Sequence, residues 1–116
     1  MPSARISVNA ELSDVLLPDL PFVRRDEYDE VIAFSYDQAD GAGYVAIPGS
    51  TAITTIQLVV LQPTQDVEVR INGQSDQGTP VSAGGIFLCM NTAITAITVN
   101  NDSGATVVIR GALFGT

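Results

Sequence analysis

The chain has 116 residues, of which 46% are hydrophobic, and a formal net charge of −8 with five arginines as its only cations. This length suits one domain with a sizeable core, and the acidic balance disfavours a nucleic-acid partner because it repels phosphate backbones. Histidine is absent, which excludes Ser-His-Asp and Cys-His catalytic sets and the usual zinc sites, so we expect neither enzymatic activity nor a cofactor.

Export and membrane signals are missing from the sequence. The first residues contain no unbroken apolar stretch of the length of a secretion signal, and no segment approaches the roughly 20 apolar residues of a membrane helix. Cys89 is the only cysteine, so no intrachain disulfide can form, and its apolar neighbours favour a small buried hydrophobe. We therefore expect a protein made in a reducing cytosol with no membrane partner.

The first thirty residues predict a strand followed by an extended arm. Ile6, Val8 and Ala10 alternate as in a strand. In the segment that follows, Pro18 and Pro21 disfavour both a helix and a paired central strand. The segment nevertheless has much to bury, in grooves of its own sandwich or of a neighbouring subunit. Its apolar residues are Val15, Leu16, Leu17, Leu20, Phe22 and Val23.

Beyond the arm, short apolar runs alternate with polar turns, and three pairs of runs predict hairpins. The pairs are 31–37 with 44–49, 53–61 with 67–72, and 94–100 with 106–114. The last pair flanks the polar turn Asn101-Asp102-Ser103-Gly104. About eight strands at this spacing predict an all-β fold, an antiparallel, jelly-roll-like sandwich over 31–116 with an N-terminal arm over 1–30.

The charged residues of the arm allow two interpretations. The acidic run from Asp26 to Glu30 lacks the ligand spacing and glycine of a calcium loop, so a solvated face or salt bridges with Arg24 and Arg25 is favoured. The same two arginines suit bidentate pairing with carboxylates of a neighbouring subunit. The residues expected to make contacts with a neighbouring subunit are Val15, Leu16, Leu17, Leu20, Phe22, Arg24 and Arg25.

The longest apolar stretch, residues 81–99, has few charges to protect an edge strand from aggregation. Burial of part of this stretch by sister subunits would remove the hazard, and a closed trimer or larger ring is one economical arrangement. Arg70 lies between Val69 and Ile71 in its run, so alternation places it on the solvated or contacting face of its strand.

The segments "VEVRING", "GIFLCM" and "ITAITVNNDSGATVVIRGALFG" in residues 51–116 are similar to small β-sandwich virion proteins of tailed bacteriophages. The resemblance implies a capsid decoration (cement) protein that binds the outer shell, partnered by the major capsid protein and by its own copies. It also implies a virion location after synthesis in the host cytoplasm, with the seven contact residues of the arm touching the capsid or a neighbouring subunit. The shared pattern is one of folding, so no site residue is carried over from it.

Two alternatives remain open at this point. A neck or tail accessory subunit differs from a decoration protein only in its location on the virion. A carbohydrate-binding host-recognition module would need exposed aromatic rings, and without tryptophan the candidates are Tyr28, Tyr36 and Tyr44 beside four phenylalanines.

Overall fold

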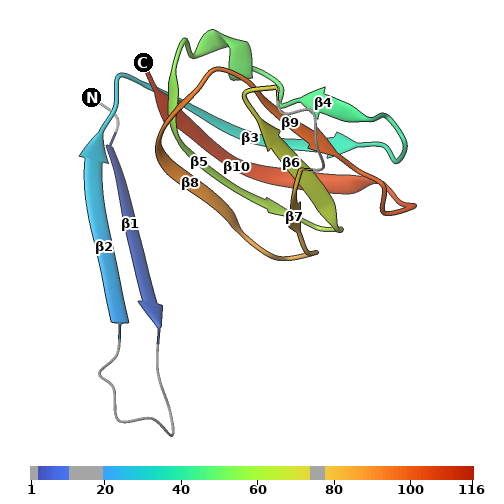
Figure 1. Ribbon diagram of the computed structural model, residues 1–116, viewed down its shortest axis with the longest axis horizontal. Helices are drawn as coiled ribbons and strands as arrows, with labels where there is room; N and C mark the ends of the chain where they lie inside the picture. Colours follow the sequence, from blue (N-terminus) through green and yellow to red (C-terminus); the bar gives the residue numbers. More distant parts are fainter. Residues whose placement is uncertain (1–2, 11–19, 74–77) are drawn as a thin grey trace, which may run out of the picture.

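The computed structural model (Figure 1) describes residues 3–10, 20–73 and 78–116, with side chains from residue 28 onward apart from residues 91 and 92. Two antiparallel sheets form a sandwich, which we call the long sheet (order β3-β10-β5-β8) and the short sheet (order β4-β9-β6-β7). A third sheet, the N-terminal ribbon, consists of β1 and β2. The strands are β1 Ser3–Ala10, β2 Leu20–Glu27, β3 Glu30–Gln38, β4 Tyr44–Ala46, β5 Ile56–Pro63, β6 Val67–Ile71, β7 Thr79–Val81, β8 Phe87–Ile94, β9 Ile97–Asn100 and β10 Val107–Gly115.

The order of the strands is that of a jelly roll. From β3 to β10 the chain alternates between the long and the short sheet, except that β6 and β7 are neighbours in the short sheet. Eight antiparallel strands wound into two four-stranded sheets in this way form a jelly roll. The predicted all-β, jelly-roll-like sandwich is therefore confirmed. Within the described residues the only helix is a 3₁₀ turn, Ser50–Ala52.

All three predicted hairpins are wrong in their pairing, although their strands and turns lie where the sequence placed them. In each case the first and second strand belong to different sheets: β3 and β4, β5 and β6, and β9 and β10. A polar turn shows where the chain reverses. It does not show whether the next strand pairs with the previous one or crosses to the opposite sheet.

The second half of the predicted arm forms a strand. Leu20–Glu27 pairs with Ser3–Ala10 in antiparallel register, with Pro21 opposite Asn9. A proline is compatible with this arrangement because both strands of a two-stranded ribbon are edge strands, and one side of each needs no partner. In Figure 1 the ribbon (blue) stands beside the sandwich and does not cross the long sheet.

The core lies between the two sheets and is built by alternation along each strand. In β10, for example, Val107, Ile109 and Leu113 are fully buried between the sheets. Cys89 packs against this core and is partly buried, in line with its interpretation as a small hydrophobe. The buried cluster consists of Ile47, Ile53, Ile56, Val59, Leu61, Val67, Val69, Val81, Ile94, Ile97, Val99, Val107, Ile109 and Leu113.

Asn101 holds the crossing from β9 to β10, and it is completely buried. Its Nδ2 donates to the carbonyl oxygens of Gln38 at 3.0 Å and Ala105 at 2.7 Å. Its Oδ1 accepts from the backbone N–H of Ser103 at 3.0 Å and from the Ser103 hydroxyl at 2.7 Å. The polar turn recognised in the sequence is thus organised by a single amide that ties the end of β3 to the crossing loop.

The change Asn101→Asp should lower the free energy of unfolding by about 3 kcal/mol or more. A carboxylate oxygen would replace Nδ2 and face two carbonyl oxygens without a proton to share. The reverse swap next to it, Asp102→Asn on the exposed side of the loop, should cost less than about 1 kcal/mol. Urea unfolding of the two variants measures the difference, and equal effects would contradict this role for Asn101.

Gly111 lies in the middle of β10, opposite Leu61 of β5. A Cβ at this position would collide with the carbonyl oxygen of Val60 and lie 2.8 Å from the Cα of Leu61. Because these are backbone atoms of a central strand, they cannot move aside without disturbing the long sheet.

We expect Gly111→Ala to reduce the free energy of unfolding by roughly 3 kcal/mol or more through overpacking. Gly41→Ala is the matched control, because a Cβ there meets nothing within 4 Å and only the positive φ of 79° opposes it. That strain costs about 1–2 kcal/mol. Thermal unfolding of both variants would refute the explanation if Gly41→Ala proved the more damaging.

Candidate interaction surface

The long sheet carries apolar residues on both of its faces. Along β10, Val107, Ile109 and Leu113 point into the core, so the residues between them point outward. Two of these outward residues, Ala112 and Phe114, are apolar and only partly buried. An antiparallel sheet that covers one core usually has a polar outer face. The apolar residues on the outer face of the long sheet therefore need an explanation.

The register of the four strands turns these outward residues into two continuous rows. Val31, Phe114, Leu58 and Met90 lie side by side across the sheet in the first row. The second row, two residues along each strand, consists of Ala33, Ala112, Val60 and Leu88. We call these eight residues the apolar band. Val31 and Leu88, at its two ends, are 42% and 39% exposed.

A polar row limits the band on one side. Arg110 of β10 stands opposite Ser35 and Gln62, and its Nη2 donates to Gln62 Oε1 at 2.9 Å. Between this row and the band lies a hollow of about 440 Å³, lined in part by Val60, Gln62, Ile86 and Arg110. Ile86 is 68% exposed, so it extends the apolar surface beside Leu88.

Tyr28 closes the other side of the band. Its ring centroid lies 5.4 Å from that of Phe114 at an interplanar angle of 46°. Tyr28 is only 5% exposed, and Leu58 of the first row is fully buried. The link between β2 and β3 is therefore anchored on the outer face of the long sheet, at the first row of the band.

The outer face of the short sheet is polar by contrast. The register places Tyr44, Glu68, Arg70, Thr98 and Asn100 on it. The Arg70 guanidinium lies 3.7 Å from the centroid of the Tyr44 ring, and the Tyr44 hydroxyl donates to Glu68 Oε2 at 2.6 Å. Arg70 thus lies on the outer face that its alternation predicted, and only the long sheet has an apolar outer face.

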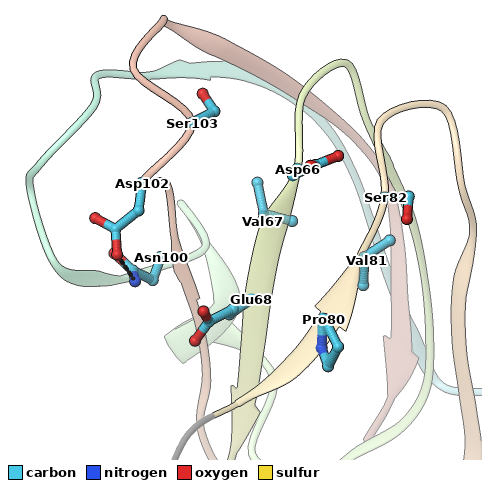
Figure 2. A pocket seen from close by; sticks show the side chains of 9 residues that line it. All are labelled: Asp66, Val67, Glu68, Pro80, Val81, Ser82, Asn100, Asp102 and Ser103. Atoms are coloured by element: carbon cyan, nitrogen blue, oxygen red, sulfur yellow. Dashed lines mark hydrogen bonds between the residues drawn. The ribbon is translucent and has the colours of Figure 1, made fainter.

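Figure 2 shows an acidic hollow of about 390 Å³ at one end of the short sheet. Each of its three carboxylates already accepts a hydrogen bond. Asp66 Oδ1 accepts from the Ala83 N–H at 2.8 Å, Glu68 Oε2 from Tyr44, and Asp102 Oδ2 from Asn100 Nδ2 at 2.8 Å. These carboxylates hold neighbouring loops and strands together. Within the described part of the chain, no three histidine, cysteine or acidic residues are grouped so as to hold a metal ion.

The three tyrosines proposed for sugar binding do not form an exposed platform. Tyr28 is buried against Phe114, and Tyr36 faces the core with its ring 6.0 Å from that of Phe34. The ring of Tyr44 is covered by the Arg70 guanidinium. Among the described residues these positions leave the carbohydrate alternative without the stacking surface on which it depended.

The residues predicted to make contacts lie partly outside the described chain, namely Val15, Leu16 and Leu17. The other four are in β2, where the register assigns them to faces of the ribbon. Leu20, Phe22 and Arg24 share one face, and Arg25 lies on the other. Their role in contacts stays a prediction.

Sequence reasoning missed the apolar band. Its signals were present in strands that are apolar at successive positions, such as Leu58-Val59-Val60-Leu61, where a strand with one wet face would alternate. The assignment of those strands to neighbouring positions in one sheet was missing, and without it the eight residues do not form a surface.

No protein-family model, curated protein or solved structure matches this chain. In the described residues, no helix has the length and apolar character needed to cross a membrane.

Burial raises the pKa of the Tyr36 hydroxyl from 10.0 to about 12, and this hydroxyl has no hydrogen-bond partner among the described residues. Between pH 10 and 12 the unfolded chain loses this proton while the folded chain keeps it, so stability should fall as the pH rises through that range. Tyr36→Phe should show a smaller fall and no loss of stability at pH 7. Urea unfolding at pH 9 and pH 11.5 tests this, and an identical fall in both proteins would disprove it.

Proposed function

We propose that this chain is a non-enzymatic structural protein of a tailed-bacteriophage virion. It acts as a capsid decoration protein that binds the outer shell as a homo-oligomer, with a trimer favoured, and stabilises the shell. The partners are the major capsid protein and further copies of the chain. The observation that carries the proposal is the apolar band, a surface suited to association with another protein surface.

The area of the band limits the free energy that association through it can contribute. One residue covers roughly 4.8 by 6.7 Å of a sheet face, and Leu58 is already buried, so the other seven residues cover at most about 225 Å². Removing that area from water contributes about 6 kcal/mol before the costs of association. This is modest for a single contact. An oligomer on a shell makes many contacts, between its copies through the bands and with the shell through the arms, so modest contacts accumulate by multivalency and oppose shell separation by mass action.

The charge distribution fits the same role. Eight of the thirteen acidic residues lie in residues 28–116, which contain only Arg70 and Arg110 as cations. Net negative charge keeps a protein with an apolar surface soluble and disfavours binding to packaged nucleic acid. The jelly roll itself is shared by virion and carbohydrate-binding proteins, so the fold alone does not choose between them. The resemblance to virion proteins and the covered tyrosines favour the virion.

A neck or tail accessory subunit is the second candidate, since it would use the same band and the same arm at a different place on the virion. The structure supports it equally, because nothing in the band depends on the shape of the surface that it meets. Binding to isolated shells distinguishes the two.

Shells purified from a phage that lacks this gene provide the test. The full chain should co-sediment with them to saturation. The double change Leu16→Asp, Leu17→Asp should weaken that binding at least tenfold, because each leucine contributes about 1.5–3 kcal/mol when buried.

The control is Ser3→Asp, Ser7→Asp, which adds the same charge to the polar face of the ribbon and should leave binding within a factor of two. Failure of the unmodified chain to bind shells refutes the decoration role. Unchanged binding of the double leucine variant refutes the contact role of the arm.

A further inference from the structure

The N-terminal ribbon is amphipathic by its register. Residues that stand opposite each other in an antiparallel pair share a face, and faces alternate along the strand. One face is polar, with Ser3, Arg5, Ser7 and Asn9 of β1 opposite Glu27, Arg25, Val23 and Pro21 of β2. The other face is largely apolar and consists of Ala4, Ile6, Val8, Ala10, Leu20, Phe22, Arg24 and Asp26.

Such a ribbon needs a covering surface. An isolated two-stranded hairpin is marginally stable in water and becomes stable when its apolar face packs on another layer. The ribbon is a sheet of its own, and neither β1 nor β2 pairs with a strand of the sandwich. The band on the long sheet is comparable, since it is an apolar face over which the described strands place no further sheet (Figure 1).

The two surfaces match in size. Two strands make a ribbon about 10 Å wide, and eight residues make it about 26 Å long. The band is two rows deep and four strands across, or about 13 by 19 Å. A ribbon that lies along the band crosses the strands of the long sheet at a steep angle, which is one of the two common ways in which sheets pack.

The strands of the ribbon differ in charge from the rest of the chain. The strands of the ribbon contain three arginines and two acidic residues, whereas residues 28–116 contain two arginines and eight acidic residues. The ribbon is therefore the net positive part of an acidic molecule. On the apolar face of the ribbon Arg24 and Asp26 balance each other, and the band contains no charged residue, so charge does not oppose the contact.

The ribbon does not lie over the band of its own molecule, beside which it stands (Figure 1). Only Tyr28 and Asp29 separate β2 from β3, and the three Cα steps from 27 to 30 span at most about 11 Å. Folding back would require the chain to reverse within these residues and to clear the roughly 10 Å between packed sheets. Tyr28 is already fixed against Phe114.

We propose that the apolar face of the N-terminal ribbon of one copy packs on the apolar band of a second copy. This inference deepens the proposed function, on which it rests for the need to form an oligomer, and it names the contact that forms that oligomer. The contact joins two different surfaces, so each copy offers one ribbon and accepts one. Closure of such contacts gives a ring or a reciprocal pair.

The test uses the full chain alone, without shells, and native mass spectrometry. Phe22→Asp places a charge on the apolar face of the ribbon, and its control Val23→Asp places the same charge on the opposite face. Leu88→Arg places a cation in the band against an arginine-bearing ribbon. Its control is Val108→Arg, a residue of similar exposure (36% against 39%) outside the band and opposite Asp37.

We expect the unmodified chain and both controls to be oligomers, and Phe22→Asp and Leu88→Arg each to be monomers with at least 100-fold weaker self-association. Mixing the two monomeric variants should give a mixed species, because one keeps its band and the other keeps its ribbon. Thermal unfolding verifies that each variant is folded, and Phe22→Ser serves as the milder change if Phe22→Asp is not.

Any one of three results overturns the proposal. The unmodified chain is a monomer, the Phe22→Asp variant still forms oligomers with itself, or the two monomeric variants form no mixed species when combined. None of them depends on shell binding. If the chain forms oligomers as described but does not bind shells, only the decoration role is refuted. If the chain binds shells as a monomer, the contact between ribbon and band is refuted.

Discussion

A sheet with apolar side chains on both faces needs a layer on each side, and this constraint governs the molecule. The long sheet has the short sheet on its inner face, where the buried cluster from Ile47 to Leu113 fills the space between them. On its outer face Tyr28 packs on the ring of Phe114 at the first row of the apolar band, and Leu88 of the second row is 39% exposed. The jelly roll thus supplies one of the two layers that its own central strands require, and we propose that association supplies the other.

The band exists because β10 and β5 are central strands with two apolar faces. Leu58 and Val59 are successive residues of β5, and both are fully buried although they point to opposite sides. Gly111 permits the close approach of the β5 backbone that keeps these strands in register. The features that stabilise the fold therefore also place the band, and a change that disturbs the register of the long sheet disturbs both.

The sequence allowed the strands, the turns, the absence of long helices and the sandwich class to be predicted, since these follow from alternation and turn chemistry within short windows. The pairing of strands could not be predicted, because a crossing between sheets and a hairpin use the same polar residues. Asn101-Asp102-Ser103-Gly104 illustrates this: its composition indicates a turn, but the bonds of Asn101 to Gln38 and Ala105 show that it bridges two sheets. The band was hidden for the same reason, as Val31, Leu58 and Leu88 become neighbours only through the order of the strands.

The reading of the arm changes in a similar way. Prolines indicated an unpaired extended segment, whereas Leu20–Glu27 pairs with Ser3–Ala10 and acquires one apolar and one polar face. A projecting ribbon of this kind extends the surface that a small domain can offer to a partner. Together with an acidic sandwich domain and an apolar band, this ribbon favours a role in assembly with other protein subunits.

Hydroxyl-radical footprinting of the unmodified chain over a range of concentrations tests the central claim most directly, because it reports the exposure of individual side chains. The claim that the outer face of the long sheet is covered in the assembled protein predicts that oxidation of Leu88 and Ile86 falls as concentration rises, while that of Val108 stays constant. Oxidation of all three residues that is the same in dilute and concentrated solution would contradict it.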